Sequence, residues 1–158
     1  MERGKFGLAH RLHCMNERPV RTKLSISADP LDVADISASI ADPGSGASVV
    51  FTGTARDHAP GKTDVTHLDY EAYPEQVEAK IAEIVADARE RWPIMHVAVA
   101  HRTGRVNVGE PSVVVAVSSA HRRDAFEAAR FIIDELKERA PIWKKEHWSG
   151  GAEWIEGA

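Results

Sequence analysis

The sequence predicts an α+β fold, because amphipathic helical segments and β-rich strands occur along one chain without any internal repeat. Two long segments carry apolar residues at three-and-four spacing, which is typical of helices with one buried face. The best strands, 96–102 and 112–118, are separated by Gly104 and Gly109 in a connection of the hairpin type. Strands joined in this way pair antiparallel, so we expect a largely antiparallel sheet.

The length of 158 residues suits one well-buried core, so we expect a single domain over 23–158. Residues 1–22 are polar and basic without clear periodicity, and we expect them to form a flexible N-terminal extension. They include His10, His13 and Cys14, but nothing nearby completes a metal set of finger-like spacing. Because Cys14 is the only cysteine, an internal disulfide is excluded.

Charge and hydropathy exclude two classes of partner. The formal net charge is −4, whereas nucleic-acid-binding domains usually carry a basic excess, so we expect no nucleic-acid partner. No apolar run approaches the roughly 20 residues that span a bilayer, so we expect no membrane partner and a cytoplasmic location. Local basic clusters in an acidic chain point to a small anion as ligand.

The first half of the chain is expected to form short strands and one short helix. A strand is expected over 23–28, and Asp29 and Pro30 then provide a cap and a first-turn proline for a short helix over 31–40. A second strand follows at 48–52, and residues 53–62 form a loop. Residues 68–73 are the next strand. Gly61-Lys62-Thr63 is not a phosphate-binding P-loop, because Arg56 stands where the motif requires glycine.

The second half holds both long helices. The first begins at Pro74 and ends at Trp92-Pro93; its apolar positions are Val77, Ile81, Ile84, Val85, Ala88 and Trp92. The second covers 122–139 and ends before Pro141; its expected inner stripe is Phe126, Ala129, Ile133, Leu136 and Ala140. Residues 142–155 alternate weakly and are expected to add edge strands.

The start of the second long helix carries an unusual cluster of cations. His121, Arg122 and Arg123 lie where the helix dipole is positive and where Asp or Glu would be stabilising. Free backbone N–H groups beside guanidinium and imidazole groups suit a phosphate or a carboxylate. The alternative is a solvated helix start whose charge is offset by Asp124 and Glu127.

Further cations occur in two other places. The loop after the second strand holds Arg56 and His58, an anion-binding fork beside a titratable ring. The alternative, which this loop taken alone favours, is a plain polar hairpin. Lys137 follows Ile133 by four residues, so it lies at the margin of the buried stripe, where lysines are often desolvated or extend toward solvent. Lys144 follows the break at Pro141, so the chain can bring it back toward Lys137.

Several separate motifs extend from about residue 24 to the end of the chain. They are Phe51-Thr52-Gly53-Thr54-Ala55-Arg56-Asp57-His58, Tyr73-Pro74, Arg91-Trp92-Pro93, His101-Arg102-Thr103-Gly104, Ser118-Ser119-Ala120-His121-Arg122 and residues 137–146. In order and spacing, these motifs resemble the large catalytic subunit of molybdopterin synthase.

The resemblance implies an α/β hammerhead fold, a central homodimer and a heterotetramer with a small ubiquitin-like sulfur-carrier subunit at each end. It implies sulfur transfer from the carrier's C-terminal Gly-Gly thiocarboxylate to cyclic pyranopterin monophosphate, giving the dithiolene of molybdopterin. No metal or other cofactor is implied. The alternative is a non-catalytic anion- or carrier-binding module on the same fold.

The resemblance also implies a set of site residues. Lys137 and Lys144 would be catalytic, and the substrate-binding residues would be Thr54, Ala55, Arg56, His121, Arg122, Lys145 and Glu146. Ala55 departs from the family pattern, in which a larger aliphatic residue is expected, but every cation of the set is present.

Overall fold

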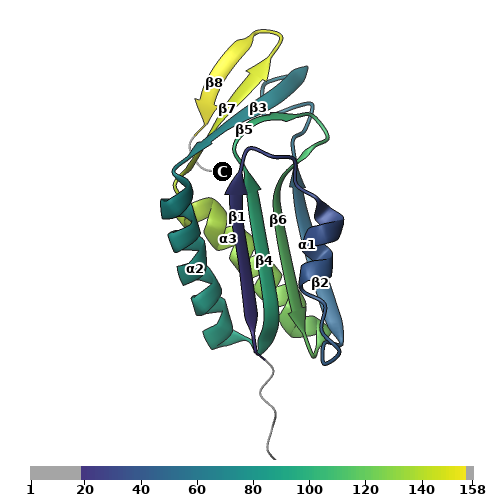
Figure 1. The fold of residues 1–158 in the computed structure, drawn as a ribbon. Helices are drawn as coiled ribbons and strands as arrows, with labels where there is room; N and C mark the ends of the chain where they lie inside the picture. Colours follow the sequence, from purple (N-terminus) through teal and green to yellow (C-terminus); the bar gives the residue numbers. More distant parts are fainter. Residues whose placement is uncertain (1–18, 156–158) are drawn as a thin grey trace, which may run out of the picture.

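A four-stranded sheet forms the centre of the molecule in the computed structural model, which describes residues 19–155 (Figure 1). The strand order is β1 (Arg21–Ser27), β4 (Ile94–Arg102), β6 (Pro111–Ser119) and β2 (Ala47–Thr54). β6 runs antiparallel to both neighbours, whereas β1 and β4 are parallel, so this sheet is mixed. β1 begins two residues before the expected start, and most of residues 1–22 lie outside the described residues.

A second sheet lies across one end of the first, at the top of Figure 1. Its order is β5 (Gly104–Asn107), β3 (Val65–Ala72), β7 (Ile142–Trp148) and β8 (Gly151–Ile155), all antiparallel. Two sequence expectations need correction here. β5 is a strand inside the connection between β4 and β6, and β7 is an internal strand, so only β8 is an edge strand of the C-terminal pair.

Two long helices cover one face of the first sheet and a short helix covers the other (Figure 1). α2 (Pro74–Arg91) and α3 (Arg122–Arg139) match the expected ranges. Ala129, Ile133 and Leu136 of the expected inner stripe of α3 are buried as predicted. Phe126 is instead 63% exposed, and the buried face also includes Ala125, Ala128 and Ile132. Small side chains, those of Ala125, Ala128 and Ala129, occupy this part of the buried face.

The two faces of β4 and β6 supply two apolar clusters, because successive strand residues point to opposite faces. Val97, Val99, Val115 and Val117 pack under α2 and α3 in the main core. The opposite face packs against the short helix α1 (Val33–Ser39). Ile36 lies within α1 and Ile40 is its C-terminal cap residue. These two side chains pack with Ala98, Ala100, Val114 and Ala116. The cap of α1 is Asp32, whose carboxylate accepts from the Asp35 N–H, and not Asp29 as the sequence predicted.

Among residues 19–155, none of the helices is both long and apolar enough to cross a lipid bilayer.

Candidate active site

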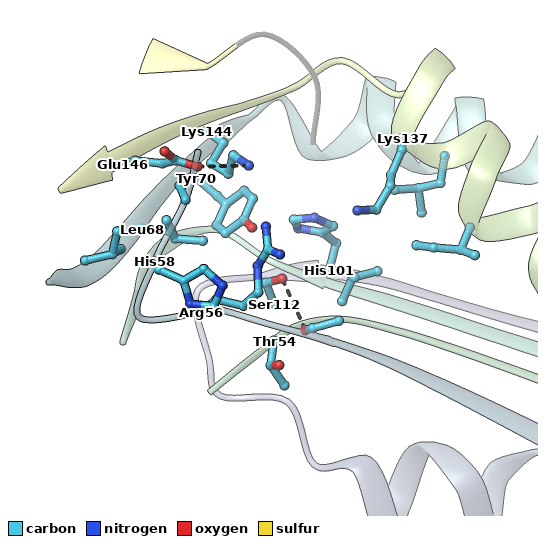
Figure 2. Close-up of a pocket in the computed structure, with 16 residues that line it drawn as sticks. Thr54, Arg56, His58, Leu68, Tyr70, His101, Ser112, Lys137, Lys144 and Glu146 are labelled. Carbon is cyan, nitrogen blue, oxygen red and sulfur yellow. Dashed lines mark hydrogen bonds and ion pairs between the residues drawn. The ribbon is translucent and has the colours of Figure 1, made fainter. Parts of the chain in front are cut away.

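A pocket of about 300 Å³ opens where the second sheet meets the strand ends of the first sheet (Figure 2). It is enclosed by the end of β2 and the loop after it, by β3, β4, β6 and β7, and by the last turns of α3. The charged and polar groups that line it are Thr54, Arg56, His58, Tyr70, His101, Ser112, Lys137, Lys144 and Glu146. Elements that are remote in sequence therefore meet here, and the pocket has three cations against one carboxylate.

Arg56 and Lys137 are the cations of this pocket without a carboxylate partner. Arg56 belongs to the loop after β2, and Lys137 belongs to the last turn of α3. Within residues 19–155, neither side chain forms a hydrogen bond or an ion pair, and Figure 2 shows both reaching into the pocket. Lys137 is exposed to solvent rather than desolvated at the helix margin. Two uncompensated cations give the pocket a positive charge that suits an anionic ligand.

Lys144, by contrast, is held by an ion-pair network on β7. Its Nζ lies 3.4 Å from one oxygen of Glu146, whose other oxygen accepts a 3.0 Å hydrogen bond from Lys62. Burial raises the pKa of the Glu146 carboxyl, but the hydrogen bond from Lys62 and the charge of Lys144 outweigh burial and lower it overall. Glu146 is therefore an anion that fixes the position of two lysines.

His101 lies on β4 in the wall of the pocket and was recognised in the sequence only as part of a motif. Its Nδ1 is 2.9 Å from the carbonyl oxygen of Arg102, so this nitrogen carries the hydrogen and donates it. Burial lowers the pKa of His101 to about 4, so the ring is neutral near pH 7 and its Nε2 has a free lone pair. Figure 2 shows the Lys137 side chain extending toward this ring.

Tyr70 is a second pocket residue that sequence reasoning missed. Its ring packs edge-on against His101, with 5.0 Å between the ring centroids. Burial raises the pKa of the Tyr70 phenol, so the hydroxyl stays protonated and can donate a hydrogen bond. A signal for His101 existed in the sequence, because it follows the apolar run Val97–Ala100 near the end of a strand; Tyr70 carried no such signal.

The expected residues Thr54 and Ala55 have different places. Thr54 lines the pocket at the end of β2. Ala55 is buried in the main core instead, and its backbone bonds to Glu110 and Gly109 at 3.1 and 2.8 Å. Its contribution is to fix the start of the loop that carries Arg56.

Lys145 does not line the pocket. Residues alternate along β7, so the side chains of Lys144 and Glu146 share the pocket face while Lys145 lies on the opposite face. There its Nζ lies 5.5 Å from the centroid of the Trp154 ring. The structure therefore does not bring Lys145 together with the other expected residues in this pocket.

His121 and Arg122 lie at the other end of α3 from Lys137. Lys137 follows Arg122 by fifteen positions, which corresponds to about 22 Å at roughly 1.5 Å per residue. Both side chains are exposed, and the His121 side chain does not cap the helix. Within one protomer, the structure therefore separates these two residues from the pocket.

The arrangement supports chemistry on an anionic group. Arg56 and Lys137 can bind and neutralise negative charge, and the Lys137 and Lys144 ammonium groups and the Tyr70 hydroxyl can donate protons. Neutral His101 can accept one. None of these steps requires a metal-binding set in the pocket.

The chain is similar in sequence to molybdopterin synthase catalytic subunits. The family model of the MoaE protein matches residues 26–139. The molybdopterin synthase catalytic subunit of Halalkalibacterium halodurans is 41% identical over 133 residues, covering 84% of this chain and 85% of that protein. The human catalytic subunit is 41% identical over 138 residues, covering 87% of this chain and 73% of the human protein.

Solved structures show the same fold. The molybdopterin synthase of Staphylococcus aureus superposes with a TM-score of 0.78 at 37% identity, covering 82% of this chain and 94% of that chain. A Helicobacter pylori complex of subunits 1 and 2 of molybdopterin-converting factor has a chain with a TM-score of 0.68 at 20% identity, covering 85% and 90% of the two chains.

The chain therefore belongs to the MoaE family. It functions as a molybdopterin synthase catalytic subunit, an enzyme of molybdenum cofactor biosynthesis, which confirms the α+β fold and the resemblance read from the sequence. The alternative of a non-catalytic binding module is set aside.

Proposed function

We propose that the pocket receives the C-terminal Gly-Gly thiocarboxylate of a small ubiquitin-like carrier and directs its sulfur to cyclic pyranopterin monophosphate. The observation that carries this proposal is the pair of uncompensated cations, Arg56 and Lys137, in one pocket. Both the thiocarboxylate and the substrate phosphate are anions, so both gain from these charges. The Helicobacter pylori complex of two converting-factor subunits supports a carrier partner by analogy.

In the proposed reaction the thiocarboxylate sulfur forms a bond to a carbon of the pterin precursor while a bond from that carbon to oxygen breaks, and the departing oxygen takes up a proton. Water then cleaves the bond between this sulfur and the carrier's acyl carbon, and the carrier leaves as a carboxylate. Two rounds supply the two sulfurs of the dithiolene. No external oxidant or reductant enters this balance, so the pocket needs only charge stabilisation and proton transfer.

The two lysines have different proposed roles. Lys137 is unpaired, so its ammonium group is available to polarise the acyl oxygen or to donate a proton as the carrier leaves. Lys144 is tethered to Glu146 at 3.4 Å, so it is better suited to hold a substrate anion in a fixed position. Arg56 is the proposed phosphate ligand, because its fork binds phosphate oxygens in pairs.

His121 and Arg122 can reach a pocket only in a second protomer. Within one chain they lie too far along α3 to act with Lys137. We therefore propose that a homodimer brings these two residues of one copy to the pocket of the other.

Mixing two inactive variants tests the shared site. Lys137→Ala and Arg122→Ala are each expected to be impaired, but a dimer of one copy each would retain one intact pocket. After unfolding and refolding together, random pairing should restore roughly a quarter of wild-type molybdopterin formation. Activity no greater than the sum of the two separate variants would refute the shared site without touching the proposed reaction.

The proposed reaction itself is tested by supplying the full chain with a thiocarboxylated carrier and cyclic pyranopterin monophosphate. Molybdopterin should form, and a carrier ending in an ordinary carboxylate should yield none. A folded chain that binds the thiocarboxylated carrier and yet forms no molybdopterin would refute it.

A further inference from the structure

The face of the second sheet that points away from the pocket carries a compact group of two histidines and one aspartate. His67 and Asp69 lie two residues apart on β3, so their side chains share one face. His147 on β7 is the direct cross-strand neighbour of His67. One ligand atom from each of the three residues can be chosen so that all lie within 4.8 Å of one another.

The contacts within this group are close but incompletely satisfied. The two imidazole rings stack, with 4.2 Å between centroids and an interplanar angle of 15°. Asp69 Oδ2 lies 2.7 Å from Nε2 of His147 and 3.8 Å from Nε2 of His67. Yet within residues 19–155 the buried His147 Nε2 forms no hydrogen bond of acceptable geometry. This nitrogen is buried beside a carboxylate without forming a hydrogen bond, so it is available to bind a ligand.

The two ring environments favour metal ligation over a plain ion pair. Thr66 Oγ1 lies 2.9 Å from Nδ1 of His67, which orients this ring and leaves its Nε2 toward Asp69. An imidazole nitrogen beside a carboxylate oxygen can ligate a cation that the two groups share.

We propose that His67, Asp69 and His147 form a binding site for a divalent transition metal, with Zn²⁺ as the best fit. Two imidazole nitrogens and one carboxylate oxygen are a common zinc set, completed by water in a fourth position. At zinc–ligand distances of about 2.0–2.2 Å, tetrahedral ligands lie roughly 3.3 Å apart, so small side-chain rotations bring the three atoms into place. Mg²⁺ and Ca²⁺ fit poorly, because they prefer oxygen ligands.

The proposed metal site lies behind the pocket, on the opposite face of the second sheet. It joins β3 to β7, and these two strands carry Tyr70, Lys144 and Glu146 on the pocket face. Bound zinc would therefore clamp the two strands from behind the pocket without entering the chemistry. The sequence alone gave no hint of this set, since eighty residues separate His67 from His147.

Zinc and cobalt binding to the full chain tests the proposal. We expect wild-type protein to bind one more Zn²⁺ per chain than His147→Ala or Asp69→Asn, measured by calorimetric titration after removal of metal with a chelator. Co²⁺ should give visible tetrahedral absorption bands in the wild type that both variants lack. Zinc should raise the melting temperature of the wild type increasingly with concentration, and Mg²⁺ should not.

The controls separate this site from other histidines. His58→Ala removes an exposed histidine outside the group and should bind as much zinc as the wild type. His10, His13 and Cys14 are present in every variant, so any zinc that they bind cancels in the comparison. If His147→Ala fails to fold by circular dichroism, Asp69→Asn carries the test. Equal zinc binding by the wild type and the folded variants, or no binding by the wild type at about 100 µM zinc, would overturn the proposal.

Discussion

At the residue scale, the pocket works through a contrast between paired and unpaired charges. Arg56 and Lys137 have no carboxylate partner among residues 19–155, whereas Lys144 is bound to Glu146 and Glu146 to Lys62. An unpaired cation in a concave site binds an incoming anion without first breaking an ion pair. Lys144, which is paired with Glu146, attracts an anion less strongly, but the ion pair fixes its position.

Arg56→Ala should weaken substrate binding more than turnover. A phosphate contact exists before and during the chemistry, so its loss should raise KM for the pterin precursor by roughly 10-fold while kcat changes little. Steady-state kinetics with saturating carrier measure both constants. The matched control is Arg130→Ala, an exposed arginine on α3 that pairs with Asp134. A drop in kcat without a change in KM would show that Arg56 takes part in the chemical step.

Glu146→Gln should change how stability depends on pH. The folded-state pKa of Glu146 is lowered, so its stabilising contribution is complete above the ordinary value of 4.5 and is lost as the pH falls through the lowered pKa. The wild type should therefore melt higher than the variant near pH 7, and this difference should shrink below pH 4.5. A difference in melting temperature that stays constant from about pH 7 to pH 3 would contradict the ion-pair account.

At the element scale, the loop between β2 and β3 is fastened over the pocket by Lys62. Its Nζ lies 3.0 Å from Glu146 on β7 and 2.8 Å from Glu153 on β8, and 4.6 Å from the centroid of the Trp148 ring. This one side chain joins the loop that carries Arg56 to the second sheet. Only 12% of the side chain is exposed, so solvent screens these contacts less than it would screen those of a surface pair.

Lys62→Ala should free this loop while leaving the core intact. Amide hydrogen exchange in residues 56–64 should rise several-fold, and exchange in β4 and β6 should not change. KM for the pterin precursor should also rise, because Arg56 is no longer held in place. Lys62→Arg should restore part of the protection. Unchanged exchange in the loop of Lys62→Ala would show that Lys62 does not fasten it.

The inner face of α3 gives a second prediction at this scale. Leu136→Ala should lower the free energy of unfolding by about 2–5 kcal/mol, because Leu136 is fully enclosed in the main core. Phe126→Ala should cost the single chain about 0.5 kcal/mol or less, since its ring is 63% exposed. Denaturant titration measures both. Equal losses of unfolding free energy in the two variants would show that Phe126 is buried, as the sequence predicted.

Local signals in the sequence were sufficient for the helices but not for the pocket wall. The ranges of α2 and α3 follow from three-and-four spacing and from Pro74, Pro93 and Pro141, all of which act within a few residues. β5 has four residues and pairs with β3, more than thirty positions away, so its existence depends on tertiary contacts.

The same distinction explains the site. Lys137 and Lys144 belong to one short segment and could be placed together, and so could Arg56 by family resemblance. His101 and Tyr70 meet only because two sheets cross, which no local pattern encodes. The separation of Arg122 from Lys137 follows from helix length alone, at about 1.5 Å per residue.

At the scale of the whole molecule, the two sheets make different contributions to the core and to the pocket. The first sheet, with α2 and α3 on one face and α1 on the other, supplies the buried core. The second sheet lies across its end and contributes Tyr70, Lys144 and Glu146 to the pocket between them. The proposed catalytic and binding groups thus lie on strands and at a helix end, with Arg56 on a loop as the exception, so most of the pocket is held in place before substrate arrives.

The most direct test of the central claim is molybdopterin formation by Lys137→Ala beside the wild type, with thiocarboxylated carrier and cyclic pyranopterin monophosphate. Lys137 is exposed and unpaired among the described residues, so the variant should fold and bind the carrier normally while its turnover falls by roughly 100-fold or more. The control Lys80→Ala removes a helical lysine on α2 that pairs with Glu83 and should keep full turnover. Near-normal turnover by a folded Lys137→Ala protein would contradict the account.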